Sequence, residues 1–278
     1  MKIDGKILAE KVLESIREEL TKLPPVTIAI VTLGPEDAWE HYVSQKIKLA
    51  RELGIKAQLI NIKNPTEEKL IETIEELNNN PEINGIIVQR PLTKHILKDK
   101  VIYAVSPQKD IDGFIKGAHF EPPVWLAVRN ILNFIYVLNI GFKSQNSDLA
   151  KWLIDKNITV LGKGETAGMP VINGLKGLGA EPQVIDSKTI NKEEILKNSD
   201  IIISAVGKRG LLEAKDLKEG IIVIGIGLHR EDGKLRPDFD EEAVSKIAKY
   251  YSPTPGGVGP LNLAYLFKNL IKAAHLEK

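Results

Sequence analysis

The chain alternates short runs of apolar, β-branched residues with longer stretches of helical periodicity, and this alternation restricts the fold more than any other feature. In the first half, residues 26–32, 55–62 and 85–89 have the pattern of buried strands. Helices are expected between them, over residues 38–53 and from the N-cap Thr66 to about residue 78. An order of strand, helix, strand, helix, strand predicts a parallel sheet covered by helices.

A second alternating set occupies the other half of the chain. Its predicted strands are residues 158–161, 183–186, 201–206 and 221–226, and its predicted helices are residues 168–178 and 192–198. Further helices are expected at residues 8–20, 95–105, 122–138, 149–155 and 260–274. The sequence therefore predicts an α/β fold with two domains, the second of them Rossmann-like with a parallel sheet.

Charge and composition exclude several classes of partner and site. The 278 residues carry 38 Lys and Arg against 37 Asp and Glu, which gives no support for nucleic acid or an acidic membrane as a partner. The absence of cysteine excludes disulfides, a thiolate nucleophile and a cysteine-based zinc site. The N-terminal residues lack the apolar core of a signal peptide, and the apolar stretch at residues 131–142 is too short to span a bilayer. We expect a cytoplasmic protein without a bound metal.

A glycine-bearing loop joins the first strand of the second set to its helix. Gly162, Lys163, Gly164 and Gly168 stand where glycines let the backbone approach a pyrophosphate and where a helix N-terminus favours negative charge. The spacing is one residue longer than the usual dinucleotide fingerprint. A plain turn between strand and helix therefore explains this loop about equally well.

Acidic and small residues follow the next two strands of the set. Asp186 ends its strand where an acidic side chain commonly binds the ribose 2′-hydroxyl of a dinucleotide, although a cap or turn residue would look similar. Ser187 and Lys188 follow it and are further candidate cofactor contacts. Gly207 and Gly210 follow the third strand, where a second loop would contact the nicotinamide side, or where they would serve as ordinary turn glycines.

Four further segments occur in a fixed order along the chain. They are Tyr42-Val-Ser-Gln-Lys46-Ile-Lys48, Gly85-Ile-Ile-Val-Gln89-Arg-Pro91-Leu92, Lys109-Asp-Ile-Asp112-Gly-Phe114 and Pro253-Thr-Pro-Gly-Gly-Val-Gly-Pro260. Together they resemble the bifunctional methylenetetrahydrofolate dehydrogenase/cyclohydrolase family. The resemblance covers nearly the whole chain, and the last two segments are highly specific as a set.

The residue types suit such chemistry without any appeal to a family. Tyr42 and Lys46 are four positions apart on a predicted helix, so a ring shares a face with an amine that can polarise an oxygen or activate water. Gln89 ends a predicted strand, where its amide can position a water, and Asp112 can accept hydrogen bonds from a planar heterocycle. Each also fits a plainer role, namely a surface Tyr–Lys pair, a strand-end amide and an Asx turn at Asp112.

The resemblance implies two reactions on tetrahydrofolate. A hydride leaves 5,10-methylenetetrahydrofolate for NADP or NAD, and water attacks the methenyl carbon that results. The implied roles are Lys46 and Gln89 for the water step, Asp112 for binding the pterin and Tyr42 for stacking on its ring.

The family also implies a homodimer and two domains with different functions. Residues 1–123, completed by residues 260–278, would form the catalytic folate domain, and residues 124–259 the dinucleotide-binding domain. A tight loop of Gly256, Gly257, Val258 and Gly259, followed by Pro260, would line a folate cleft between them. The alternative for this loop is a turn that closes the domains and needs positive φ.

Several residues depart from the family pattern. Trp39 stands where the family usually has Ser, and Pro122-Pro123 where it has Thr-Pro. In the second domain, Lys163-Gly164 replaces Arg-Ser and Asp186-Ser187 replaces His-Ser. Gly225 stands in place of Asp, and Asn262 in place of Thr. These changes fall at ligand-contacting positions and affect the choice of cofactor and the detailed substrate more than the reaction. The family favours NADP, whereas Asp186 would repel a 2′-phosphate and favours NAD; Lys163 and Lys188 act in the opposite direction.

Two alternatives stay open on the sequence alone. A related two-domain dehydrogenase of a shikimate-like hydroxy acid would also use a lysine and an aspartate in a cleft. A member that binds folate or a dinucleotide without turnover would serve as a sensor or partner subunit. The presence of Lys46, Gln89 and Asp112 together argues against this second alternative.

Overall fold

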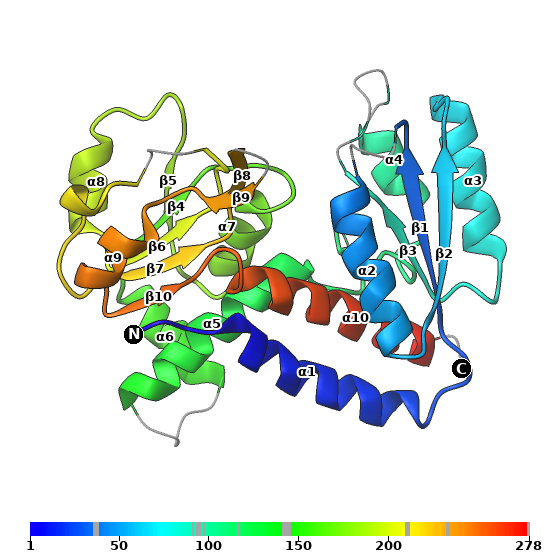
Figure 1. Cartoon of the computed structure of the whole chain (residues 1–278), viewed down its shortest axis with the longest axis horizontal. Coiled ribbons are helices and arrows are strands. Elements are labelled where there is room, and N and C mark those ends of the chain that lie inside the picture. The colour runs from blue at the N-terminus through cyan, green and yellow to red at the C-terminus, as the bar shows by residue number, and fades with distance from the viewer. Residues whose placement is uncertain are drawn as a thin grey trace. The chain divides into compact units, whose positions relative to one another are not determined.

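The computed structural model describes residues 1–35, 39–90, 92, 96, 98–115, 117–140, 146–208, 212–231 and 234–276. The chain divides into two compact units, whose elements are labelled in Figure 1. Val12–Pro123 and Leu263–Lys278 form the three-stranded unit, and Met1–Lys11 and Val124–Asn262 form the five-stranded unit, each named after its larger sheet. Both units combine helices with a parallel sheet, which confirms the predicted α/β class.

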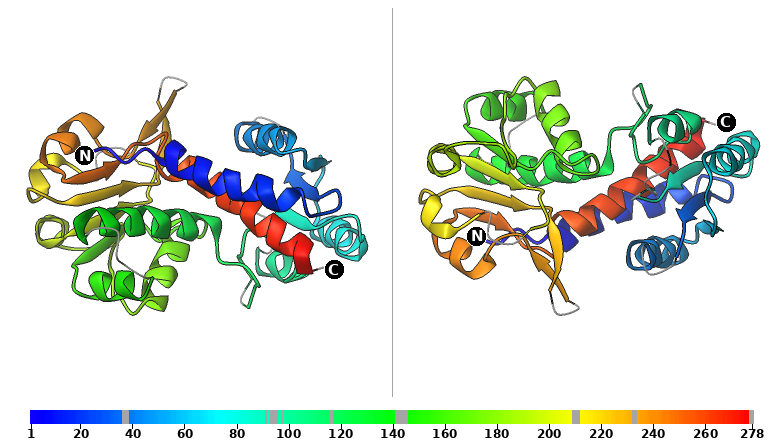
Figure 2. Two further views of the ribbon diagram at one scale, coloured as in Figure 1. Left: turned by 90° about the horizontal axis from the view of Figure 1, so that it is seen from below. Right: turned by 90° about the horizontal axis from the view of Figure 1, so that it is seen from above.

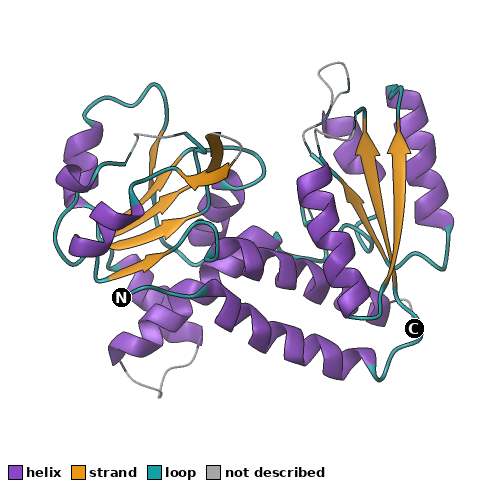
Figure 3. Ribbon diagram, viewed as in Figure 1, coloured by secondary structure: helices purple, strands orange, loops and turns teal. Residues whose placement is uncertain are grey.

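The sheet of the three-stranded unit has the order β2-β1-β3, and its strands are parallel. β1 (Thr27–Leu33) is central, and all of its residues are buried, as expected for a continuous apolar strand covered on both faces. β2 (Lys56–Ile62) is an edge strand and stays partly exposed, while β3 (Gly85–Val88) is mostly buried. Figure 3 shows these strands with the helices beside them.

The helices of this unit follow the predicted periodicity. They are α2 (Glu40–Glu52), α3 (Glu67–Asn79), α4 (Lys98–Ala104) and most of α1 (Gly5–Leu20) and α10 (Val258–Leu276). The predicted cap of α3 is confirmed, because Thr66 Oγ1 accepts a hydrogen bond from the Lys69 backbone N at 3.2 Å. Leu70 and Ile74 of α3 pack with Val101 of α4 in one apolar core.

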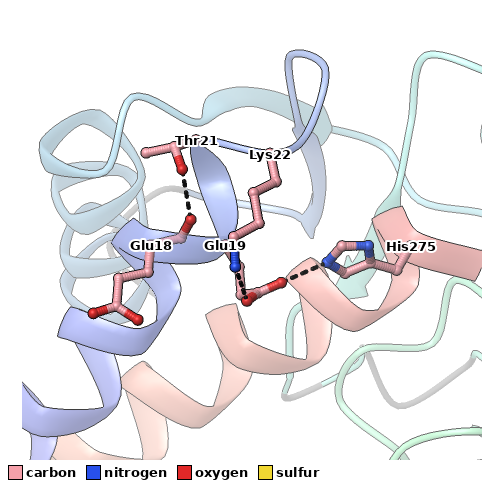
Figure 4. Close-up of polar contacts among 5 residues, drawn as sticks. All are labelled: Glu18, Glu19, Thr21, Lys22 and His275. Carbon is pink, nitrogen blue, oxygen red and sulfur yellow. Dashed lines mark hydrogen bonds and ion pairs between the residues drawn. The ribbon is translucent and has the colours of Figure 1, made fainter.

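The C-terminal ends of α1 and α10 meet within this unit, as the close-up in Figure 4 shows. The Glu19 carboxylate contacts Lys22 Nζ at 2.9 Å and His275 Nε2 at 3.1 Å, and Lys22 and His275 both lower the pKa of Glu19. Exposed pairs of this kind add little to stability. α10 begins at Val258, two residues before the predicted start at residue 260, because proline is tolerated in the first turn of a helix.

The main sheet of the five-stranded unit has the order β10-β7-β6-β4-β5 with all strands parallel. Its strands are β4 (Ile158–Leu161), β5 (Gln183–Ile185), β6 (Ile201–Ser204), β7 (Ile222–Gly225) and β10 (Tyr250–Ser252). From β4 the chain turns first to β5 on one side and then to β6 on the other. This reversal creates a switch point between β4 and β6, where ligands bind in open α/β sheets.

Helices cover both faces of this sheet. They are α5 (Pro123–Ile140), α6 (Asn146–Ile154), α7 (Gly168–Gly177), α8 (Lys192–Asn198) and α9 (Glu241–Ile247). In Figure 2, α9 lies on the opposite face of the sheet from α5 and α7. Val244 of α9, Leu196 of α8 and Val223 of β7 share one apolar core. Among the helices in the described part of the chain, none is long and apolar enough to cross a membrane.

The predicted elements of this unit agree closely with the structure. β4 and α8 have the predicted bounds, and β5, β6 and β7 lie within theirs. The hairpin of β8 (Leu228–Glu231) and β9 (Lys234–Pro237), together with α9 and β10, was not predicted. The hairpin carries charged residues in place of an apolar run, and β10 has only three residues, so neither gives a periodic signal. Residues 38, 91, 95 and 210, which the sequence predictions include, lie outside the described residues.

Residues 1–11 group with the five-stranded unit because they contact its edge strand. Lys2 forms a bridge to Tyr251 of β10, and the Ile3 backbone N donates to Tyr251 O at 2.8 Å. The functional division into residues 1–123 with 260–278, and residues 124–259, stays a prediction.

Candidate functional site

Lys46 and Gln89 meet in the three-stranded unit although 43 residues separate them in the chain. Lys46 lies on α2, and Gln89 directly follows β3. Lys46 Nζ donates to Gln89 Oε1 at 2.7 Å. The Gln89 amide is oriented by its other end, because Nε2 donates to Arg90 O at 2.8 Å. The pair is therefore fixed at the carboxyl end of a parallel strand, where α/β active sites form.

Burial favours the neutral form of Lys46. Burial lowers the pKa of the Lys46 amine, and the nearby Asp112 carboxylate raises it by a smaller amount. Burial raises the pKa of Asp112, against the opposing effects of Lys46 and Arg90. An amine with a lowered pKa can accept a proton near neutral pH. Lys46 is thus not the exposed surface residue of the plainer interpretation.

The turn that carries Asp112 is closed by a different carboxylate. Asp110 accepts hydrogen bonds from the backbone N of Gly113 at 3.1 Å and of Ile115 at 2.9 Å. Gly113 has a φ of +68°, which glycine adopts without strain. The alternative of an Asx turn at Asp112 is therefore wrong, because Asp110 forms that turn. An aspartate three residues before a glycine is the signal that could have identified it.

Asp110 gives a pH-dependent prediction, because burial raises its pKa from 3.8 to about 6. A folded pKa above the unfolded value means that the native state binds more protons in that interval. The free energy of unfolding of the native chain minus that of Asp110→Asn should therefore be largest below about pH 4. This difference should fall by about 3 kcal/mol as the pH rises through 6. Urea unfolding of both proteins between about pH 4 and pH 7 measures this difference. A difference that does not change with pH would contradict the assignment.

A second buried residue holds the same turn from α10. Asn269 is fully buried, and its Nδ2 donates to Ile111 O and to Glu121 O, each at 3.0 Å. α10 also packs closely on β3, because a Cβ at Gly85 would lie 2.7 Å from Leu270 Cδ1. The last helix of the chain therefore fixes the backbone on which Asp112 stands. Sequence reasoning missed Asn269, whose partners are about 150 residues away.

Aromatic groups lie around these polar residues. Tyr42 stands one helical turn before Lys46, with half of its surface exposed, so its ring is open to a ligand. His41 contacts the Tyr42 ring edge-on, with 5.5 Å between centroids. The Arg90 guanidinium lies 4.8 Å from the centre of the Phe114 ring. Arg90, Phe114 and Asp112 line a small pocket with apolar residues of β3 and α4.

The glycine loop after β4 has the close contacts that a dinucleotide loop requires. Gly162 has a φ of +87°, and a Cβ there would lie 3.0 Å from Ala205 O. Gly168 begins α7, and a Cβ there would overlap the Gly162 carbonyl. A Cβ at Gly164 would meet open space. The loop therefore requires two of its glycines for its own packing and leaves space at the third, an arrangement that fits a pyrophosphate.

Lys163 and Asp186 form an ion pair. Lys163 Nζ lies 2.8 Å from Asp186 Oδ2, and the Asp186 Oδ1 accepts from the Lys188 backbone N at 2.8 Å. Lys163 and the Lys188 amide together lower the pKa of Asp186 to about 2. From the sequence, Lys163 was expected to favour NADP and Asp186 to favour NAD. The structure places their charges in contact, so each reduces the field that the other exerts on a ligand.

Most of the remaining predicted residues occupy turns, but Val258 and Gly259, which were predicted to belong to the tight loop, lie in the first turn of α10 instead. Gly207 follows β6 with a φ of +65°, and Ser187 lies in the turn after β5. Gly256 has a φ of +113°, as expected for a turn that needs positive φ, and its carbonyl accepts from the Gly5 backbone N at 2.9 Å. A Cβ at Gly257 would lie 2.6 Å from Pro253 O. Pro260 lies in the first turn of α10. Among the described residues, no group of three or more acidic or histidine side chains could hold a metal ion.

Comparisons with known families match both units. A model of the tetrahydrofolate dehydrogenase/cyclohydrolase catalytic domain matches residues 3–112, and a model of the NAD(P)-binding domain of that family matches residues 145–278. The chain belongs to the tetrahydrofolate dehydrogenase/cyclohydrolase family. This confirms the resemblance and the Rossmann-like character of the second domain.

Individual members of the family are similar along the full length. The bifunctional protein FolD of Campylobacter concisus is 37% identical over 281 residues, which cover 99% of this chain and 98% of that protein. The structure of the bifunctional enzyme FolD from Campylobacter jejuni has a TM-score of 0.89 and 31% identity, covering 100% of this chain and 99% of that one. A Trypanosoma brucei member, solved with NADP and an inhibitor, has a TM-score of 0.85 and 26% identity, covering 99% and 97%.

Membership of the tetrahydrofolate dehydrogenase/cyclohydrolase family does not favour either alternative left open by the sequence. A hydroxy-acid dehydrogenase would not account for a match to the folate family over both units. A member without turnover would not require an amine with a lowered pKa in contact with Gln89.

Proposed function

We propose that this chain oxidises 5,10-methylenetetrahydrofolate with a nicotinamide dinucleotide and hydrolyses the methenyl product to 10-formyltetrahydrofolate. The observation that carries the proposal is the 2.7 Å contact between Lys46 Nζ and Gln89 Oε1, beside Asp112, in a chain of this family. The bifunctional relatives named above provide the substrate class.

In the water step, Lys46 serves as the proton acceptor. Water adds its oxygen to the cationic methenyl carbon and loses one proton to the neutral Lys46 amine, while Gln89 orients the amine. The bond from that carbon to N5 then breaks, and N5 takes the electron pair and a proton, which Lys46 can return. The hydroxyl proton leaves as the formyl C=O forms, so one proton is released overall.

Asp112 and Tyr42 bind the substrate in this proposal. The Asp112 carboxylate accepts hydrogen bonds from the pterin, on a turn held by Asp110 and Asn269. The exposed ring of Tyr42 stacks on the substrate ring. Gly256, Gly257 and Pro260 are proposed to contact the folate from the turn before α10.

The five-stranded unit binds the dinucleotide in this proposal, and the bound dinucleotide supplies the hydride acceptor. Gly162, Gly164 and Gly168 admit the pyrophosphate at the N-terminus of α7, and Gly207 lies across the switch point. Asp186, with Ser187 and Lys188, faces the adenosine ribose. The structure of the Trypanosoma brucei member contains NADP, and the same cofactor class is proposed here.

A direct test of the dehydrogenase uses the purified chain with methylenetetrahydrofolate and either NADP or NAD. We expect reduced dinucleotide to form with this substrate and not with a shikimate-like hydroxy acid. Dinucleotide reduction with the hydroxy acid and not with the folate would support the alternative dehydrogenase instead.

A homodimer and a cytoplasmic location also belong to the proposal. Light scattering of the purified protein should give twice the mass of one chain.

The choice between NAD and NADP depends on the ion pair of Lys163 and Asp186. We expect NAD to be used at least as well as NADP, because the Asp186 carboxylate repels a 2′-phosphate and neutralises Lys163. Asp186→Ser removes the repulsion and releases Lys163 to contact the phosphate. The ratio of kcat/KM for NADP to that for NAD should then rise about tenfold, the scale of one charge interaction near a surface.

Lys163→Met is the matched variant for this prediction. It removes the cation and leaves the carboxylate, so the ratio should move toward NAD. Steady-state kinetics with both dinucleotides measures all three proteins. If the native chain strongly prefers NADP and Asp186→Ser leaves the ratio unchanged, Asp186 does not face the ribose.

A further inference from the structure

Asp238 is a fully buried carboxylate in the five-stranded unit that no proposed step uses. It follows β9, and its Oδ2 accepts hydrogen bonds from Ser204 Oγ at 2.7 Å, Val206 N at 3.2 Å and Gly207 N at 3.4 Å. All three donors belong to one segment of four residues at the end of β6. A single oxygen atom therefore fixes the backbone of residues 204–207.

Burial of this carboxylate is costly. Burial raises the pKa of Asp238, and the opposing effects come from Ser204 and from backbone N–H groups. Its second oxygen, Oδ1, is buried and has no hydrogen-bond partner among the described residues. A buried carboxylate that is only partly satisfied is less favourable than a neutral group of similar shape. A need to hold residues 204–207 in position therefore explains this carboxylate better than a contribution to stability does.

The segment held by Asp238 lies directly against the glycine loop. A Cβ at Gly162 would be 3.0 Å from Ala205 O and 3.1 Å from Val206 Cγ2, so Gly162 packs on residues 205 and 206. The Ala205 backbone N also donates to Leu161 O at 2.9 Å. A displacement of residues 205–207 would therefore be transmitted to the loop after β4.

Gly227 provides the space for this arrangement. A Cβ at Gly227 would lie 2.5 Å from Gly207 N and 2.9 Å from Asp238 Cγ. The carboxylate and the Gly207 amide can approach each other only because residue 227 has no side chain. Segments after β6, β7 and β9 thus meet at one carboxylate, on the edge of the sheet where the switch point lies.

We propose that Asp238 is a positioning residue for the dinucleotide site, acting by holding residues 204–207 against the Gly162 loop. The inference rests on the proposed binding of a dinucleotide by this unit. It requires dinucleotide binding to depend on Asp238 while hydrolysis of methenyl-folate, which uses no dinucleotide, does not.

The test compares Asp238→Ala, Asp238→Asn and Gly227→Ala with the native full-length chain. NADP and NAD are each titrated by calorimetry, and methenyl-folate hydrolysis is measured without a dinucleotide. For Asp238→Ala we expect Kd for the dinucleotide to rise about ten- to a hundredfold, the scale for loss of hydrogen bonds to a charged group, and hydrolysis to stay within about twofold. Asp238→Asn keeps an acceptor oxygen and should stay within about tenfold of the native Kd. Gly227→Ala should weaken binding like Asp238→Ala, from the other side of the contact.

Ser199→Ala is the matched control. Ser199 is buried in the same unit, and its Oγ lies 2.7 Å from Thr159 Oγ1. Because it precedes β6, it lies at the amino ends of the parallel strands, away from residues 204–207 at their carboxyl ends. We expect it to lower stability without changing dinucleotide affinity.

Three results would overturn the inference. They are native dinucleotide affinity in Asp238→Ala, a parallel loss of hydrolysis and dinucleotide binding in that variant, and equal weakening of the dinucleotide in Ser199→Ala. If Asp238→Ala does not fold, Gly227→Ala decides by the same criteria. A native chain that binds neither dinucleotide would instead refute the proposed function, and the two failures are thereby distinguished.

Discussion

Replacing Lys46 with methionine is expected to lower the hydrolysis of methenyl-folate by about 10²-fold or more, the usual scale for a positioned acid–base group. Methionine keeps much of the side-chain length and removes the amine that contacts Gln89 at 2.7 Å. Because Gln89 keeps its bond to Arg90 O, the strand end should stay in place and folding should change little. Loss of absorbance from methenyl-folate, corrected for spontaneous hydrolysis, measures the rate.

Lys48→Met is the matched control for this variant. Lys48 lies on the same helix with most of its side chain exposed, and its Nζ is 3.9 Å from Glu52. Hydrolysis by the Lys48 variant should match the native rate. Near-native hydrolysis by Lys46→Met, above the background, would refute the role of Lys46. A native rate that rises with pH through the lowered pKa of Lys46 would identify the neutral amine as the active form.

Asp112→Asn is expected to weaken folate binding by roughly 1–3 kcal/mol, because it places an N–H donor where the pterin requires an acceptor. The turn should survive, since its hydrogen bonds are made by Asp110 and Asn269. Dinucleotide binding should not change. Titration of the variant with a folate and, separately, with NADP measures both affinities.

The two titrations distinguish a ligand contact from a structural role. Equal weakening of folate and dinucleotide would mean that Asp112 supports the fold of its loop. Asp110→Ala provides the comparison, because it removes both hydrogen bonds to the turn and should lower stability.

Local sequence signals were sufficient for most of the fold. β4 and α8 were predicted with their bounds because their residues carry a complete apolar or helical pattern. Thr66 was predicted as a cap because capping involves residues only three positions away. The hairpin of β8 and β9 depends on pairing between charged segments, which single-strand patterns do not report.

The candidate site was predicted less completely. Lys46, Gln89 and Asp112 were found from their segments, but their convergence depends on strand order, which a sequence does not display directly. Asn269 and Asp238 were missed because each acts on backbone atoms far away in the chain. Lys163 and Asp186 were predicted to have opposite effects on the choice of cofactor, and only the 2.8 Å contact shows that their charges are paired.

The water step is proposed to take place in the three-stranded unit, with Lys46 and Gln89. The decisive measurement is the hydrolysis of 5,10-methenyltetrahydrofolate by the purified native chain with no dinucleotide present. We expect a rate above the spontaneous background that increases in proportion to enzyme concentration, with 10-formyltetrahydrofolate as the product. A rate equal to the background, from a folded chain that binds the folate, would contradict it.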